Sequence, residues 1–193
     1  VIIVNIQLKK YGGDLAIGAY GIINSIAFTF VMIILGLTQG MQPIIGYNYG
    51  AKLQHRVLST LKKGMIAGFV ITTIGFLVAE LCPRLIASAF TNDEEMINLS
   101  ITGFRLFMLA FPIVGMQIVA SNFFQAIGKA KIAIFLSLTR QLLFLIPALY
   151  LIPLILELNG VWLSTAVADF LSAFVSLWVL VASIKKMKKE ISL

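Results

Sequence analysis

Long apolar runs separated by short polar segments dominate the chain. A membrane helix needs about 20 apolar residues to cross about 30 Å of hydrocarbon. An apolar stretch at residues 1–8 is too short to span alone, and we interpret it as the end of a helix that begins upstream. The pattern predicts an all-α, polytopic transmembrane bundle. Five runs reach spanning length, at residues 15–45, 64–83, 96–126, 132–156 and 161–184.

The composition agrees with a membrane bundle and excludes other classes. Of the 193 residues, 60% are hydrophobic and 12% are charged, whereas a soluble domain is about 45–50% apolar and about 25% charged. A disordered chain, a nucleic-acid-binding domain and a disulfide-stapled secreted module are excluded. The single cysteine, Cys82, leaves no internal disulfide and no cysteine metal cluster. The net charge of +7 falls in the loops, so it does not call for a nucleic-acid partner.

Basic residues predict the orientation in the membrane. They concentrate in alternate loops and in the tail at residues 185–193, and the positive-inside rule places that set in the cytoplasm. Trp162 and Trp178, near opposite ends of the last run, fit interfacial aromatic anchors. We therefore expect a cytoplasmic C-terminus. The basic residues of this set are Lys52, Arg56, Lys62, Lys63, Lys129, Lys131, Arg140, Lys185, Lys186, Lys188 and Lys189.

Three charged residues lie well inside the predicted spans. Charges at this depth usually face the bundle interior or a water-filled cavity. Arg105 and Asp169 each lie about 12 Å from the outer end of their span, at 1.5 Å of rise per residue. Their matched depth and opposite sign favour an ion pair, with two independent residues as the alternative. Arg140 needs either a partner or a route to the cytoplasm.

Polar and aromatic residues within the spans are candidates for a substrate cavity. A stripe on the first span suits either helix packing or the wall of a cavity for large apolar cations. The inner half of the third span is polar on part of its surface, and the prolines of the third and fourth spans imply bent helices. Bent spans with polar midsections are typical of alternating-access transporters. The candidates are Asn24, Phe28, Met32, Gln39, Gln42, Met108, Phe111, Pro112, Gln117 and Asn122.

Catalysis has little support in the sequence. His55 is the only histidine and lies in a basic loop. The spans contain neither a nucleophile paired with a base nor an acidic cluster that would hold a metal. The stretch GYNYG at residues 46–50 is not a phosphate loop, since no strand precedes it and no Gly-Lys-Ser/Thr follows it. We therefore expect a protein that is not an enzyme.

Several segments resemble one transporter family. The run GLTQGMQPIIGYNYGAK at residues 36–52 closely resembles the second-half signature of the multidrug and toxic-compound extrusion (MATE) transporters. YGGD at residues 11–14 and AYGI at residues 19–22 fit the turn and helix start before it. QAIGK at residues 125–129 resembles the end of the family's tenth helix. GVW at residues 160–162, with AD at residues 168–169, resembles the start of its last helix.

The resemblance implies a fold, a function and partners. The chain is similar to the second six-helix half of a twelve-helix transporter, so its partners would be the N-terminal half of the same polypeptide and membrane lipids. The family exports small cationic, often aromatic drugs in exchange for H⁺ or Na⁺, with no further cofactor. The branch of the family whose second-half motif looks like this one contains prokaryotic multidrug exporters, which implies a prokaryotic plasma membrane. The family's coupling acids lie on its first helix in some members and on its seventh and tenth in others. This chain lacks the first and most of the seventh, and the span that resembles the tenth carries Arg105 but no carboxylate, so no coupling residue can be transferred.

A lipid-linked oligosaccharide flippase of the same superfamily is the alternative function. Such a flippase needs a strongly cationic cavity for a pyrophosphate group. The only basic residues within the predicted spans are Arg105 and Arg140, which favours the drug exporter.

Overall fold

Helices form every regular element in the part of the chain that the structure describes. The computed structural model describes the backbone of residues 2–191 and the side chains of residues 2–187. It confirms the all-α fold class. The last two residues of the predicted basic tail lie outside the described residues. The elements are α1 (Ile2–Gly50), α2 (Gln54–Leu81), α3 (Pro83–Ser88), α4 (Glu94–Phe107), α5 (Phe111–Ala126), α6 (Ala130–Leu138), the π-helix η1 (Thr139–Leu145), α7 (Ile146–Leu151) and α8 (Pro153–Ile191).

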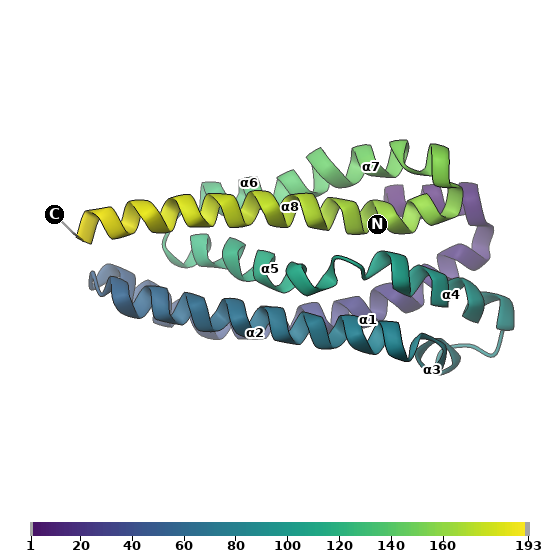
Figure 1. Ribbon diagram of the computed structural model, residues 1–193, viewed down its shortest axis with the longest axis horizontal. Helices are drawn as coiled ribbons and strands as arrows, with labels where there is room; N and C mark the ends of the chain where they lie inside the picture. Colours follow the sequence, from purple (N-terminus) through teal and green to yellow (C-terminus); the bar gives the residue numbers. More distant parts are fainter. Residues whose placement is uncertain (1, 192–193) are drawn as a thin grey trace.

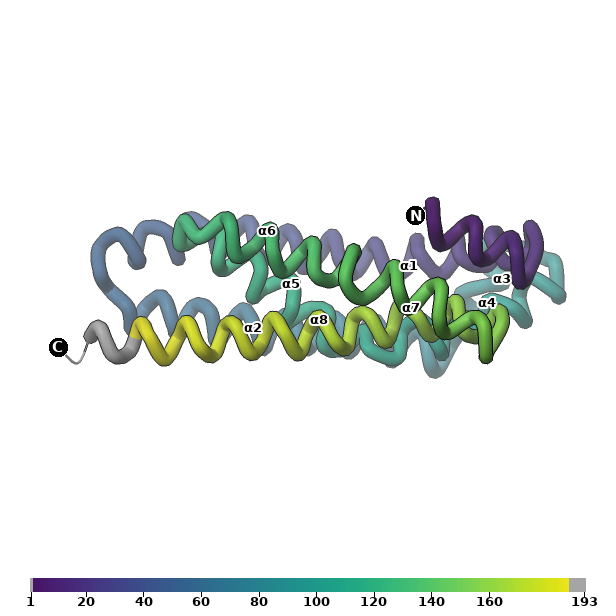
Figure 2. The backbone as a smooth tube through the Cα atoms, turned by 90° about the horizontal axis from the view of Figure 1, so that it is seen from above, coloured from purple at the N-terminus to yellow at the C-terminus, as the bar shows by residue number. Residues whose placement is uncertain are grey.

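The long helices run along the longest axis of the molecule (Figure 1). Helix α2 packs against α5 and α1, α5 packs against α8, and η1 and α7 also contact α8. The connection between α1 and α2 lies at the same end of the bundle as the C-terminus, and α3 and α4 lie at the opposite end (Figure 2). Most of the bundle therefore consists of helices that lie side by side, with short connections at two ends.

Helix α1 has one break and then continues through its proline. Gly13 adopts φ 67° and ψ −162°, a conformation that glycine reaches without a Cβ penalty. The segment before it folds back on the long one (Figure 2). The long segment, residues 14–50, stays helical through Pro43 and measures about 55 Å at 1.5 Å per residue. The helix therefore projects beyond the hydrocarbon thickness of a bilayer.

The proline of the third span marks a bend, as predicted. Helices α4 and α5 meet at an angle of 55°, and Pro112 lies in the first turn of α5. The π-helix η1 ends just before Pro147, and Pro153 begins α8. Glu157, at φ 48°, breaks α8 near its start. The chain reverses there, so α8 returns antiparallel to α6, η1 and α7.

Small residues let α2 and α5 approach closely. A Cβ at Gly68 would lie 3.0 Å from the backbone oxygen of Gly115, so the two backbones are in direct contact. Thr72, one turn further along α2, donates a hydrogen bond of 2.9 Å to the carbonyl of Pro112. Such small-residue contacts are common between membrane helices, because dispersion and hydrogen bonding replace the hydrophobic effect there. Gly64, Gly68, Thr72 and Gly75 form this face of α2.

The outer surface is apolar and the interior holds one of the two tryptophans. In the described residues four helices are long and apolar enough to cross a membrane, and a fifth if α4 and α5 form one span. Trp178 is 70% exposed. The interpretation of Trp162 as an interfacial anchor is wrong, since this side chain is 1% exposed and packs against Tyr20 and Gly103. Trp162 lies near the start of α8, and α4 covers it there. The sequence pattern indicated the position along the helix but not this neighbour.

Candidate functional site

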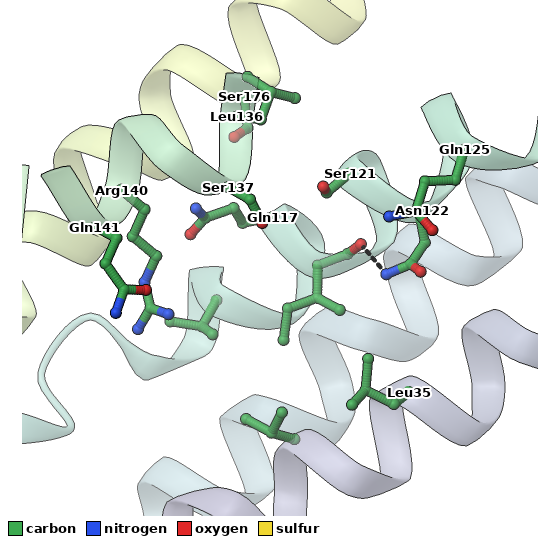
Figure 3. Close-up of a pocket in the computed structure, with 13 residues that line it drawn as sticks. Leu35, Gln117, Ser121, Asn122, Gln125, Leu136, Ser137, Arg140, Gln141 and Ser176 are labelled. Atoms are coloured by element: carbon green, nitrogen blue, oxygen red, sulfur yellow. Dashed lines mark hydrogen bonds between the residues drawn. The ribbon is translucent and has the colours of Figure 1, made fainter. Parts of the chain in front are cut away.

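A pocket of about 330 Å³ with several polar lining residues lies between α1, α5, α6, η1 and α8. We call it the Arg140 pocket. Most of its polar lining is made of amides and hydroxyls, and its apolar lining comes from α1, α5 and α6 (Figure 3). The lining residues are Val31, Leu35, Val114, Gln117, Ile118, Ser121, Asn122, Gln125, Leu136, Ser137, Arg140, Gln141 and Ser176.

Helical spacing brings the polar side chains of α5 to the pocket. Gln117, Ser121 and Gln125 recur every four residues, and Asn122 lies beside them, so they share one helix face. Two of these side chains already donate to backbone carbonyls. Nδ2 of Asn122 donates to the carbonyl of Ile118, and Oγ of Ser121 donates to the carbonyl of Ala133 at 3.5 Å. Helix α5 is well packed and presents amide groups to the pocket.

The π-helix positions the charged residue. In η1 the backbone N–H of Ile146 donates to the carbonyl of Gln141, five residues earlier. A π-helical turn rotates the following side chains relative to a regular α-helix, and such turns are frequent at functional sites. Arg140 and Gln141 lie in η1, and both line the Arg140 pocket.

Arg140 forms an ion pair with Asp169 of α8. The Nε of Arg140 donates to Oδ1 of Asp169 at 2.5 Å. The Asp169 side chain is only 6% exposed, whereas the Arg140 side chain is 41% exposed. The carboxylate is therefore enclosed in the bundle, and the guanidinium lies between it and the pocket.

Asp169 belongs to a buried polar face of α8. Thr165, Asp169, Ser172 and Ser176 follow one another at helical spacing, and all four are buried. The hydroxyl of Ser172 donates to the backbone carbonyl of Asp169. This face lies toward α5 and η1, which both pack against α8. The last span thus carries a polar stripe into the interior.

Two buried polar atoms at the pocket have no hydrogen-bond partner in the described residues. They are Oε1 of Gln117 and Oγ of Ser176, whose side chains belong to residues that are 6% and 0% exposed. More than about 90% of buried polar groups in proteins have a partner. A buried acceptor without one costs about 1–3 kcal/mol. Two residues that line the pocket therefore keep unused hydrogen-bonding capacity just beneath its surface.

The structure brings some predicted cavity residues together and separates others. Gln117, Asn122 and Arg140 line the pocket, and Gln42 lines a narrow crevice that shares Asn122 with it. Met108 and Phe111 are buried in the hydrophobic core, and the carbonyl of Pro112 accepts the bond from Thr72. These three do not line the Arg140 pocket. Asn24, Phe28, Met32 and Gln39 lie on the exposed side of α1, outside the pocket.

The expected ion pair between Arg105 and Asp169 is wrong. Nε of Arg105 lies 3.6 Å from Oε1 of Glu80 on α2, and both side chains are substantially exposed. Helix α4 does contact α8, but it does so through Gly103 and Trp162. Depth along a span does not say which side of the helix a residue occupies. Equal depth is therefore not enough to predict that Arg105 and Asp169 form a pair.

Five polar residues of the pocket are not among the cavity candidates predicted from the sequence, namely Ser121, Gln125, Ser137, Gln141 and Ser176. Ser137 and Gln141 are four residues apart, and Ser176 continues the polar stripe of α8 seven residues after Asp169. Both are helical spacings. Polar residues on a single face of the fourth and last spans were therefore a usable signal.

The family model described as MatE matches residues 1–151. The chain belongs to the MatE family. Among curated relatives, the multidrug export protein MepA of Staphylococcus haemolyticus (strain JCSC1435) is 25% identical over 178 residues. The alignment covers 92% of this chain and 39% of MepA. This chain thus spans about two fifths of the length of the curated relatives that it matches.

Solved structures of MatE proteins share the fold. The MATE multidrug transporter DinF-BH in complex with rhodamine 6G is 35% identical with a TM-score of 0.79, covering 91% of this chain and 39% of that one. A MATE structure in complex with MaL6 has a TM-score of 0.90 at 20% identity, covering 97% and 43%. These matches confirm the resemblance seen at residues 36–52 and identify a multi-pass membrane protein of a transporter family.

Proposed function

We propose that this chain forms the C-terminal half of a secondary active transporter that exports cationic drugs in exchange for H⁺ or Na⁺. It acts as a transporter and not as an enzyme, in the plasma membrane of a prokaryote with its C-terminus in the cytoplasm. The observation that carries the proposal is the Arg140 pocket, a polar cavity inside an apolar helical bundle, with buried groups that lack a partner among the described residues. A half-open pocket with polar groups in such a bundle suits a transported ligand.

The exposed side of α1 supports a second helical half. Asn24, Phe28, Met32 and Gln39 combine amide, aromatic and thioether groups on that side. The same helix contributes Val31 and Leu35 to the Arg140 pocket. We propose that this surface and the pocket form one wall of a larger cavity, which the rest of the polypeptide closes. The relatives are more than twice as long as this chain, which supports the same arrangement.

The drug exporter is favoured over the flippase. Arg140 is the one basic residue among the described residues that line the pocket, and Asp169 neutralises it. A pyrophosphate group would need several unpaired cations. The curated relatives are multidrug export proteins, which also favours drug export.

Efflux from cells tests the proposal. The full-length protein is expressed in bacteria that lack their own multidrug pumps. The cells are loaded with rhodamine 6G, the dye found in complex with DinF-BH. We expect efflux that depends on an imposed H⁺ or Na⁺ gradient, and the gradient that supports efflux identifies the coupling ion. Efflux equal to that of empty-vector cells under both gradients would refute the proposal.

A further inference from the structure

The Arg140 pocket combines one cationic donor with buried acceptors. Arg140 is the only charged side chain among the described residues that line it. We propose that the pocket recognises the carboxylate of a zwitterionic ligand, whose cationic part lies toward Gln117 and whose carboxylate binds Arg140. This inference rests on the proposed function and adds the chemical class of the substrate.

The ion pair leaves the outer edge of the guanidinium available. A guanidinium carries five N–H donors, and Asp169 takes the one on Nε. The side chain is 41% exposed and lines the pocket. The two terminal nitrogens can therefore donate a parallel pair of bonds to a carboxylate, the geometry in which arginine binds that group best. Asp169 fixes the guanidinium in place, so less side-chain entropy is lost on binding.

The acceptors of the pocket fit the cationic part of the same ligand. Oε1 of Gln117 is buried and has no partner in the described part of the chain. As an amide oxygen it accepts hydrogen bonds. It has almost no accessible surface in this conformation, so a rotation of the Gln117 amide is what brings it to an N–H group of a ligand. Ser176 supplies a buried hydroxyl that likewise has no partner within residues 2–187. Val31, Leu35 and Ile118 supply apolar contact for the body of the ligand.

The charge balance favours a zwitterion over a simple ion. Arg140 and Asp169 together are neutral. A ligand with one positive and one negative group adds no net charge to this half-open site, whereas a cation such as rhodamine 6G leaves its charge uncompensated and binds less tightly. The volume of about 330 Å³ lies at the lower end of ligand pockets. It accommodates the carboxylate end and part of an aromatic body.

Two dyes that differ at one group test this inference. Rhodamine 6G is the ethyl ester of rhodamine 19, so the two share one cationic ring system and only rhodamine 19 carries a free carboxylate. Binding of each dye to the purified protein, as its gene encodes it, is measured by fluorescence anisotropy in detergent. We expect the wild type to bind rhodamine 19 about tenfold more tightly than rhodamine 6G, as befits a bond between charged groups.

The variants remove the guanidinium without leaving a buried charge. Arg140→Gln combined with Asp169→Asn neutralises both partners, and we expect the preference for rhodamine 19 over rhodamine 6G to fall to about twofold or less. Arg140→Lys keeps the pair charged but lacks the planar fork, so it should lose part of the preference even if the double variant unfolds. Arg105→Gln with Glu80→Gln is the matched control, because that pair lies outside the pocket.

Each result decides the matter. A wild type that binds both dyes equally, or binds neither, overturns the inference. So does a preference that survives in both Arg140 variants, or is lost equally in the Arg105 control. Efflux of rhodamine 6G without any carboxylate preference would leave the proposed function standing and refute this inference alone. An Arg140-dependent preference in a protein that exports neither dye would refute the proposed function instead.

Discussion

The Nε of Arg140 donates a hydrogen bond to Oδ1 of Asp169 across the hairpin formed by η1 and α8. The two partners differ in exposure, with the Asp169 side chain at 6% and the Arg140 side chain at 41%. Removing one partner therefore has a different consequence from removing the other. An unpaired carboxylate stays enclosed, whereas an unpaired guanidinium can turn into the pocket.

We predict that Arg140→Gln destabilises the protein more than Asp169→Asn. Arg140→Gln leaves a buried, unpaired carboxylate, and we expect a loss of about 3 kcal/mol, near the value for a broken buried pair. Asp169→Asn should cost about 1–2 kcal/mol, as expected for one hydrogen bond to a charged group. Thermal unfolding of the purified variants in detergent measures both. A larger loss for Asp169→Asn would contradict the asymmetry.

The role of Asp169 in transport is separable from its role in stability. If the pair is structural, exchanging the charges, with Arg140→Asp and Asp169→Arg in one protein, should restore part of the stability lost in the single variants. If Asp169 couples ion movement, Asp169→Asn should abolish gradient-driven efflux while expression persists. We expect the structural outcome, because Arg140 already occupies the carboxylate. Unchanged efflux together with unchanged thermal stability would exclude both roles.

We predict that Gly115→Ala weakens the contact between α2 and α5. A Cβ at this position would lie 2.7 Å from Oγ1 of Thr72, so the helices must separate, at a cost of about 1–3 kcal/mol. The control is Gly36→Ala, where no atom of the described chain lies within 4 Å of the new Cβ and better helix propensity should stabilise by up to about 1 kcal/mol. Unfolding temperatures distinguish the two, and equal shifts would argue against close packing as the cause.

We predict that Lys62 and Cys82 lie on opposite sides of the membrane. They lie toward opposite ends of α2 and are both exposed, and the basic residues place Lys62 in the cytoplasm. A membrane-impermeant maleimide should label Cys82 in intact cells. Lys62→Cys in a Cys82→Ser background should react only after permeabilisation, and Asn92→Cys in that background should behave like Cys82. Labelling of Lys62→Cys in intact cells would reverse the orientation.

We predict that residues 1–193 expressed alone do not transport. The chain spans 39% of the length of MepA, and in our proposal the substrate cavity needs a second half to close it. The chain reconstituted in vesicles should show no rhodamine 6G movement under an imposed H⁺ or Na⁺ gradient. The protein as its gene encodes it is the positive control. Gradient-driven dye movement by the chain alone would show that one half suffices.

Local sequence determined the helices and their bends. The uncharged apolar runs are long enough to span a membrane, and backbone groups in lipid must bond within their own segment, so the all-α bundle follows from the hydrophobic pattern. Pro112 predicted the bend before α5, because proline lacks the N–H that would continue the helix. The motif at residues 36–52 indicated the family, which the match over residues 1–151 confirms.

Only the tertiary structure decided which charges meet. Position along the chain assigned a depth to Arg105, Arg140 and Asp169, but an ion pair also requires that two helices be neighbours and that both side chains lie on the facing sides. The reversal at Glu157 lays α8 against η1, and the π-helical turns direct Arg140 toward Asp169. Hydrophobic periodicity does not encode the extra residue of a π-turn or the choice of neighbour, because both are set by packing between helices.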